Sequence, residues 1–438
     1  MDFRTIIAKR REGMVHSKEE LTFLAEGAAK GDIPDYQLSA WLMAAYLKPL
    51  TNQETVDLTI AMADSGDRLD LTGVPKPWVD KHSTGGVGDK TTLVLGPLLA
   101  ACGLSVIKMS GRGLGITGGT IDKLKAIPGF SSDLTPKKMV AQAKKIGIAV
   151  AGQTAHLAPA DKALYALRDV TETVSSIPLI VSSILSKKVA GGAETVILDV
   201  KCGSGSFNST REQAEKLADA LVTVGKLAGL RAFAAISDMD QPLGSAVGNS
   251  LEVKEAIDVL TKPENELSPN TKRFRELCRY YGALALRVSG IAATAGEALE
   301  RIEDTLQSGR ALDKANQWIK AQGATVDFND TSWLIVAPIQ VELNAKTAGC
   351  IGRVDARTLG EIALDLGAGR REKDDEIDLS VGMVINVKVG DMISANHLLA
   401  TVHAATQEAA NAAIARLEHA IQIQTAPIPP RPILIRPA

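Results

Sequence analysis

Residues 80–92, DKHSTGGVGDKTT, decide how the fold of this chain is interpreted. They end the β-branched run WVDKHS and precede an apolar helical run, so we expect a loop between a strand and a helix. The N–H groups of such a glycine-rich loop, with the dipole of the next helix, form an anion site. Asp89 stands where a Walker A motif needs glycine. Its carboxylate would repel a triphosphate, so the loop favours one compact phosphate over a nucleoside triphosphate.

Three residues of this segment are candidate phosphate donors: Lys81, Ser83 and Thr92. A glycine-rich turn without a ligand is the alternative. That alternative does not explain why Lys81, His82 and Ser83 fall where a strand ends, which is the usual ligand edge of an open α/β sheet.

A second glycine-rich segment, KMSGRGLGITGGTIDKLK at residues 108–125, follows the strand-like run SVIKMS. It contains the GxGxxG pattern, but a dinucleotide fingerprint needs a long helix directly after the glycines. Here glycines and threonines continue the loop. We therefore expect the two loops to share one phosphate pocket, with Ser110 and Thr120 as donors and Lys108 adding charge.

A third group of polar residues lies in LYALRDVTETVSSIPLIVSSILSKK. Ser183 and Lys187 are four residues apart and so share a helical face, and Arg168 lies on the preceding helical segment. Together they suit a small planar ligand with carbonyl oxygens and a ring N–H. A solvated charged face is the alternative, although the apolar run before Lys187 indicates a mostly buried helix.

Alternating strands and helices after residue 75 predict an α/β fold with a mostly parallel central sheet. A small all-helical lobe is expected from two separated segments, and a C-terminal α+β subdomain follows. The expected boundaries are 1–65 (helical lobe, first segment), 66–154 (α/β, phosphate-binding), 155–192 (helical lobe, second segment, with the planar-ligand residues), 193–331 (α/β, second segment) and 332–438 (C-terminal subdomain).

Local signals predict where several elements begin. Ser17 and Glu20 form a capping-box pattern for a helix that ends at Gly31, and a later helix is expected after Ser209 with Glu212 as its partner. SWLIVAP, from residue 332, is expected to be a strand. Residues 382–404 resemble half of a lipoyl- or biotinyl-type barrel, but the carrier lysine is not evident, so we expect a structural accessory.

Composition narrows the class of protein. A net charge of −2 over 438 residues and scattered basic residues give no field to recruit nucleic acid. No apolar run approaches a membrane span, and the N-terminus has no signal-peptide core. Four distant cysteines without a CxxC pair favour a reducing cytoplasm and disfavour zinc or disulfides.

Five segments carry a resemblance to a known family: DKHSTGGVGD, KMSGRGLG, LAPADKALYALRDVT, SSILSKK and DQPLGSAVGNSLEVKEAI. The chain resembles the pyrimidine nucleoside phosphorylase and thymidine phosphorylase family over essentially its whole length. The resemblance implies a homodimer formed through the helical lobe and an α/β domain that closes on the substrates. It also implies reversible phosphorolysis of a pyrimidine nucleoside to free base and (deoxy)ribose-1-phosphate, with phosphate as co-substrate and no organic cofactor.

The resemblance also assigns residues. Phosphate would meet Lys81, Ser83, Thr92, Lys108, Ser110 and Thr120, and the pyrimidine would meet Arg168, Ser183 and Lys187. Arg168, Lys187 and His82 would be catalytic, with His82 near the 2-carbonyl and aided by a pKa near neutrality. Lys108 is typical of broad-specificity members, whereas thymidine phosphorylases tend to carry methionine. We therefore expect uridine, thymidine and deoxyuridine as substrates rather than thymidine alone.

Two positions depart from the family pattern. Ile116 stands where members normally have histidine, close to the expected base pocket, and Lys125 stands where they normally have glutamate. Ile116 puts base preference and rate in question. Lys125 is expected to reorganise only a surface pair.

Some members hold a monovalent cation at positions that match Gly88, Leu243, Ala246 and Glu255. Lys90 stands here where those members have threonine. We expect the Lys90 ammonium to pair with Glu255 and to substitute for a K⁺ ion.

Two competing functions remain from the sequence. A nucleoside-binding protein that lost catalysis through Ile116 is one. A phosphoribosyltransferase is the other, but it would need a pyrophosphate and magnesium site, and the first two loops hold no acidic pair of that kind.

Overall fold

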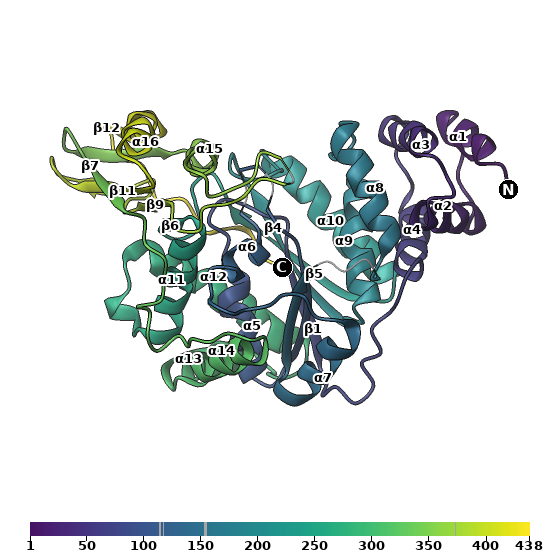
Figure 1. The fold of residues 1–438 in the computed structure, drawn as a ribbon, viewed down its shortest axis with the longest axis horizontal. Helices are drawn as coiled ribbons and strands as arrows, with labels where there is room; N and C mark the ends of the chain where they lie inside the picture. The colour runs from purple at the N-terminus through teal and green to yellow at the C-terminus, as the bar shows by residue number, and fades with distance from the viewer. Residues whose placement is uncertain (114, 117, 153–155, 373) are drawn as a thin grey trace.

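The computed structural model describes residues 1–113, 115–116, 118–152, 156–372 and 374–438. It has an all-helical lobe, a large α/β domain and a C-terminal α+β region (Figure 1). The expected fold class is confirmed.

The helical lobe is built from two separated parts of the chain, and Figure 1 shows them side by side near the N-terminus. Trp41, Leu58 and Leu164 belong to one buried apolar cluster, so both parts share a core. The Ser17–Glu20 capping box forms as expected, and Gly31 ends its helix with φ +74°. The helices are α1 (Phe3–Arg11), α2 (Lys18–Lys30), α3 (Asp35–Leu47), α4 (Asn52–Asp64), α8 (Pro159–Val170) and α9 (Ile177–Ala190).

A six-stranded sheet with the order β13-β5-β4-β1-β2-β3 forms the centre of the α/β domain. Its first five strands in sequence are parallel, and β13 pairs with β5 in the antiparallel direction. Strand order reverses between β1 and β4, which is where open α/β sheets bind ligands. The strands are β1 (Trp78–Ser83), β2 (Ser105–Ser110), β3 (Ile148–Gly152), β4 (Thr195–Cys202), β5 (Arg231–Asp238) and β13 (Leu434–Arg436).

Helices cover both faces of this sheet, which explains its nearly continuous burial. The helices of this domain are α5 (Thr91–Ala101), α6 (Thr120–Leu124), α7 (Pro136–Ile146), α10 (Arg211–Leu227), α11 (Asn249–Thr261), η1 (Glu264–Glu266), α12 (Pro269–Val288), α13 (Ala295–Gln307) and α14 (Arg310–Ala321). The predicted cap of α10 is wrong by one residue. Thr210 caps the helix and Gln213 completes the box, because the Gln213 side chain accepts from the backbone of both Ser209 and Thr210.

The C-terminal region contains two small sheets and two helices: β7 (Ile339–Asn344), β8 (Gly349–Val354), α15 (Ala356–Leu366), β9 (Gly382–Ile385), β10 (Met392–Ile393), β11 (Leu398–Ala404), α16 (Gln407–Ala420) and β12 (Ile421–Gln424). Strand β6 (Ala246–Val247), from the α/β domain, joins one of these sheets. The prediction of a strand at SWLIVAP is wrong. Asp330 accepts from the Ser332 N–H, and the Trp333 indole N–H donates to the Asp327 carbonyl, so this run folds as a local turn.

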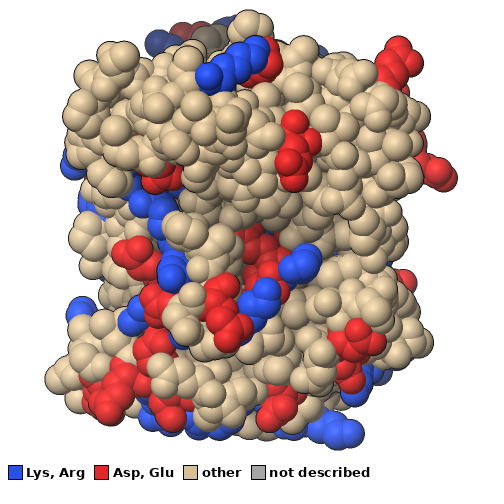
Figure 2. Space-filling model, turned by 90° about the vertical axis from the view of Figure 1, so that its left-hand side faces the viewer, with Lys and Arg blue, Asp and Glu red and all other residues tan. Residues whose placement is uncertain are grey.

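Figure 2 shows the face that holds the C-terminal sheets and the nearby helices. Acidic and basic side chains are intermixed over its lower half, and few charges lie on its upper half. This face therefore carries no large single-sign field. Among the residues that the structure describes, no helix has the length and apolar character needed to span a membrane.

Candidate active site

A cavity of about 200 Å³ lies where the loops after β1 and β2 meet, at the carboxyl edge of the sheet. Residues from β1, β2, α9 and the loop after β4 surround it. They are His82, Ser83, Thr84, Gly85, Asp89, Thr92, Lys108, Met109, Ser110, Gly111, Arg112, Gly113, Gly118, Gly119, Thr120, Lys187, Lys188 and Phe207. The cavity thus contains five of the six expected phosphate ligands.

The first loop turns at Gly85, which has φ +89°, and its N–H donates to the Ser83 hydroxyl at 3.1 Å. Asp89 accepts from the N–H and the hydroxyl of Thr91, at 3.1 and 2.7 Å, and so fixes the start of α5. Burial opposes the charged form of Asp89, yet Lys81 and Lys201 hold its pKa well below its usual range. The carboxylate is therefore ionised, and it holds Thr91 at the end of the loop.

Lys81 is the expected phosphate ligand that does not line the cavity. Its ammonium donates to the Thr91 hydroxyl at 2.6 Å and to Asp199 at 3.0 Å. Asp199 also pairs with Lys201 at 2.7 Å and accepts from the Tyr281 hydroxyl at 2.8 Å. Lys81 therefore stabilises the first loop through a buried polar network outside the cavity lining.

The second loop brings Lys108, Ser110 and Thr120 to the same cavity. The Ser110 hydroxyl is buried and has no hydrogen-bond partner among the residues that the structure describes. Lys108 donates to the Lys81 carbonyl and lies 3.6 Å from Asp80. Burial lowers the Lys108 pKa to about 8, despite the nearby Asp80. The described part of the loop thus offers the uncommitted Ser110 hydroxyl and an ammonium with a lowered pKa.

His82 lines the cavity between the two loops and α9. Burial lowers its pKa well below the ordinary value, and the charges of Lys188, Lys108 and Lys187 lower it further. The expectation of a pKa near neutrality is therefore wrong. The imidazole is neutral at pH 7 and can donate a hydrogen bond from one ring nitrogen.

The expected pyrimidine ligands are only partly brought together. Lys187 lines the cavity, donates to the Ser183 hydroxyl at 3.1 Å and forms an ion pair with Asp161. Arg168 does not line the cavity. Its guanidinium donates to the carbonyls of Leu179 at 3.0 Å and Val174 at 2.6 Å, and so ties α8 to the start of α9.

Lys188, Arg112 and Phe207 are among the cavity residues that were not predicted from the sequence. Lys188 is buried and pairs with Asp80 at 2.6 Å. Phe207 is 68% exposed although it borders a cavity. The available signal was an aromatic residue within CGSGSFNS, directly after β4, where small and polar residues otherwise predominate.

The Lys90 ammonium lies among the atoms expected to hold a cation. It donates to the carbonyls of Leu243 at 2.7 Å and Ala246 at 3.1 Å, and to Glu255 at 2.6 Å. Gly88 has φ +75°, and a Cβ there would lie 2.8 Å from the Leu243 oxygen. The predicted Lys90–Glu255 pair is confirmed, and Gly88 is needed for the close approach of the two loops.

Neither of the two residues that depart from the family pattern, Ile116 and Lys125, lines the cavity. Ile116 does not line the cavity and instead meets α15, since a Cβ on Gly360 would lie 3.0 Å from the Ile116 Cβ. Lys125 is exposed at the end of α6, in agreement with the expected surface role.

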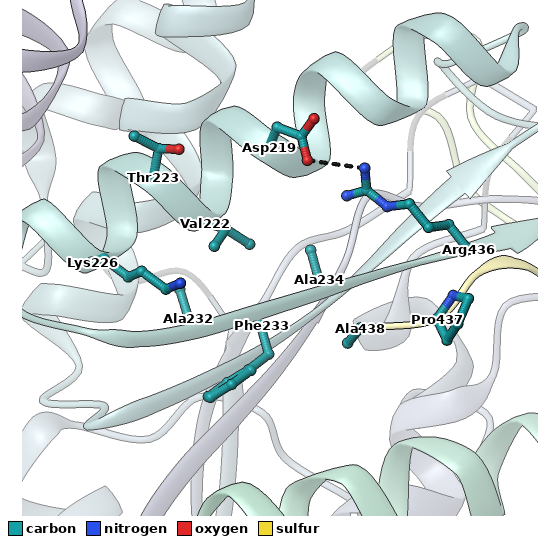
Figure 3. Close-up of a pocket in the computed structure, with 10 residues that line it drawn as sticks. All are labelled: Asp219, Val222, Thr223, Lys226, Ala232, Phe233, Ala234, Arg436, Pro437 and Ala438. Atoms are coloured by element: carbon teal, nitrogen blue, oxygen red, sulfur yellow. Dashed lines mark ion pairs between the residues drawn. The ribbon is translucent and has the colours of Figure 1, made fainter.

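A second cavity, of about 440 Å³, lies between α10, β5 and the residues around β13 (Figure 3). Asp219 and Arg436 form an ion pair of 2.9 Å across one side. This cavity contains none of the predicted site residues and is lined mainly by apolar and exposed groups. The smaller cavity, with its convergent hydroxyls and lysines, is the candidate active site.

Comparisons with known proteins agree with this architecture. Residues 4–66 match the glycosyl transferase family helical bundle domain, residues 75–312 match the glycosyl transferase family a/b domain, and residues 350–424 match the pyrimidine nucleoside phosphorylase C-terminal domain. The chain is 47% identical to a pyrimidine-nucleoside phosphorylase of Staphylococcus haemolyticus, covering 96% of this chain and 95% of that protein.

The chain belongs to the pyrimidine-nucleoside phosphorylase family. A relative of that name from Geobacillus stearothermophilus is 46% identical, with 97% of this chain and 96% of that protein covered. The expected family and the expected enzyme class, a glycosyltransferase, are therefore confirmed.

The fold is also similar to anthranilate phosphoribosyltransferase from Thermus thermophilus, with a TM-score of 0.59. The two chains are 16% identical, and the match covers 74% of this chain and 99% of that one. At this identity the likeness concerns the fold alone. Within the described residues, no group of three or more His, Cys, Asp or Glu side chains is placed to hold a metal ion.

Proposed function

We propose that the protein catalyses the reversible phosphorolysis of pyrimidine nucleosides, giving free base and (deoxy)ribose-1-phosphate in nucleoside salvage. The observation that carries this proposal is the shared cavity. The Ser110 hydroxyl, buried and without a partner among the described residues, lies there with the Lys108 ammonium, His82 and Lys187. The names of the curated relatives support the same reaction.

Phosphate would bind between the two loops, against the first turn of α5. Ser83, Thr92, Ser110 and Thr120 supply hydroxyls there, and Lys108 supplies charge. Phosphate itself is the nucleophile, so the protein needs none. The Cys202 thiol agrees with this, because burial raises its pKa and it does not line the cavity.

Cleavage of the N-glycosidic bond leaves negative charge on the departing base. Lys187 would take up charge at a carbonyl of the pyrimidine, and neutral His82 would donate a hydrogen bond to the 2-oxygen. Arg168 and Ser183 are buried beside this subsite and would hold Lys187 and α9 in place, or reach the base after domain closure.

Lys108 supports broad substrate use by uridine, thymidine and deoxyuridine, because its ammonium reaches the cavity where the sugar and phosphate would meet. A thymidine-restricted phosphorylase is the alternative. A further alternative is a catalytically impaired nucleoside-binding homologue caused by Ile116. The placement of Ile116 against α15, outside the cavity lining, favours an active enzyme.

A substrate panel tests the proposal. Uridine, thymidine, deoxyuridine and cytidine are incubated with and without inorganic phosphate, using the wild type and Ile116→His. We expect phosphate-dependent release of uracil and thymine by the wild type. No turnover of any nucleoside by either protein would overturn the proposed function.

We further propose that the Lys90 ammonium takes the place of a monovalent cation. It contacts three oxygens, from the carbonyls of Leu243 and Ala246 and from Glu255, at hydrogen-bond distance. Because the ammonium is covalently attached, the charge at this point does not depend on dissolved K⁺.

The helical lobe supports the proposed homodimer. Six large apolar or aromatic side chains are exposed on α3 and α8: Tyr36, Met43, Tyr46, Leu47, Tyr165 and Val170. An exposed apolar set of this kind is typical of an interaction surface. All four cysteines are free, which supports the proposed reducing, cytoplasmic location. Light scattering on the wild type and on Tyr36→Glu/Leu47→Glu tests the dimer, with monomers expected for the double variant.

A further inference from the structure

A buried ion pair joins the phosphate-loop region to the C-terminal region of the chain. The Arg370 guanidinium lies 2.9 Å from one oxygen of Asp122, at the start of α6. The two residues are 6% and 3% exposed. A buried pair of this kind adds little net stability, because desolvation offsets the attraction, so its value lies in what it positions.

Both partners of this pair also hold the glycine-rich loop by its backbone. The second carboxylate oxygen of Asp122 accepts from the Gly113 N–H at 2.7 Å. The Arg370 carbonyl accepts from the Gly115 N–H at 2.9 Å. A glycine-rich loop has few side chains of its own to fix its path, so backbone contacts of this kind must define it.

A second buried ion pair, Lys123 with Glu252, holds the other end of the same loop. The Lys123 ammonium donates to the Gly118 carbonyl at 3.1 Å and lies 3.3 Å from Glu252 on α11. Lys123 and Glu252 are 0% and 3% exposed. The two ends of the loop also touch, since a Cβ on Gly119 would lie 2.1 Å from the Gly113 nitrogen.

Both ends of this loop belong to the candidate active site. Gly113, Gly118 and Gly119 line the cavity beside Ser110 and Thr120. The C-terminal region meets the loop at further points, because a Cβ on Gly369 would lie 3.1 Å from the Gly115 carbonyl. The loop is thus packed directly against a part of the chain that supplies none of the described cavity-lining residues.

We propose that Asp122 and Arg370 are positioning residues for phosphate, and that the C-terminal region thereby contributes to catalysis. The pair sets the path of the glycine loop, and the loop places the Ser110 and Thr120 hydroxyls around the nucleophile. This inference rests on the proposed phosphate site. Lys123 with Glu252 provides the second anchor of the same loop.

The test compares Arg370→Met with Arg275→Met. Arg275 is a matched control, because it is itself buried and forms an ion pair with Glu303 at 2.8 Å, away from the cavity. We expect Arg370→Met to lower kcat/KM for inorganic phosphate by about 10- to 100-fold, as for a displaced reacting group, with the KM for uridine unchanged. Arg370→Lys keeps the charge and should recover part of the loss. Arg275→Met should leave both substrate dependences unchanged.

Phosphate binding measured on folded protein separates the possible outcomes. Thermal shift is recorded against inorganic phosphate for wild type, Arg370→Met, Asp122→Asn, Ser110→Ala and the control Arg275→Met. Loss of phosphate affinity in Arg370→Met, Asp122→Asn and Ser110→Ala, with none in Arg275→Met, supports the proposal. Loss in Ser110→Ala alone overturns the positioning role while leaving the phosphate site intact. No loss in Ser110→Ala overturns the phosphate site, and the positioning role with it. A fall in stability equal to that of Arg275→Met, with unchanged phosphate affinity, also overturns the positioning role.

Discussion

Replacing Lys90 by threonine gives the most direct test of the buried ammonium. The substitution removes the cation that faces Glu255 and the carbonyls of Leu243 and Ala246. Glu255 keeps its hydrogen bonds from the Ser245 and Ala246 N–H groups at 2.7 and 2.8 Å, but it loses its one ion-pair partner among the described residues. Removing one partner of a buried pair typically costs about 3–5 kcal/mol.

Dissolved potassium should restore the stability and activity that the Lys90→Thr variant loses. We expect the variant to unfold several degrees below the wild type in choline chloride and to recover in potassium chloride at the same ionic strength. Uridine phosphorolysis, measured in both salts, should follow the same pattern. The wild type should show no difference between the two salts.

Lys388→Met is a matched control for this experiment. Lys388 donates to the carbonyls of Pro242 and Gly244 at 2.6 and 2.7 Å on the same loop, but within the described part of the chain it forms no ion pair with a carboxylate. Burial lowers its pKa to about 7, so much of it is already neutral near physiological pH. Its variant should not respond to K⁺. A Lys90→Thr protein that is equally stable and active in both salts would refute the argument.

Three further predictions concern the cavity. The Lys108 ammonium, with a pKa of about 8, is charged below that pH and neutral above it. The KM of the wild type for phosphate should therefore rise above pH 8, and the KM of Lys108→Met should not show this rise. His82→Ala removes one donor to the leaving base and should lower kcat by about 10²–10³-fold, corresponding to roughly 2.7–4 kcal/mol. Because the pKa of His82 is lowered well below its ordinary value, any acidic limb of kcat/KM near neutral pH should come from phosphate and persist in His82→Ala. Ile116→His should change the ratio of uridine to thymidine turnover by less than about tenfold, because Ile116 faces α15.

Each of these predictions has a contradicting result. An unchanged alkaline rise in Lys108→Met would assign that titration to another group. A His82→Ala enzyme with wild-type kcat would remove the imidazole from the mechanism. Full activity restored only in Ile116→His would show that the wild type is the impaired homologue.

Local patterns were enough to predict the parts of the fold that local physics controls. Strands β1 and β2 run over the residues expected from WVDKHS and SVIKMS. The Ser17–Glu20 box formed because its two partners are three residues apart. At α10 two overlapping boxes were available, Ser209 with Glu212 and Thr210 with Gln213, and composition alone could not choose between them.

The parts of the site that were missed depend on distant contacts. The Asp122–Arg370 pair joins residues 248 positions apart, and no spacing rule connects them. The low pKa of His82 results from burial together with lysines of β1, β2 and α9, which meet only in the folded chain. Lys187 and Lys188 are neighbours in sequence, yet one pairs with Asp161 and the other with Asp80, because successive helical residues point in different directions.

Strand β13 has a consequence for how the chain folds during its synthesis. Residues 434–436 cover the outer edge of β5, whose own residues end at Asp238. On the ribosome, this edge therefore has no native partner while the chain from residue 239 to residue 433 is made. An open strand edge is a template for pairing with other chains. In that interval the nascent protein exposes an unpaired strand edge, so we expect chaperones that shield strand edges to engage it then.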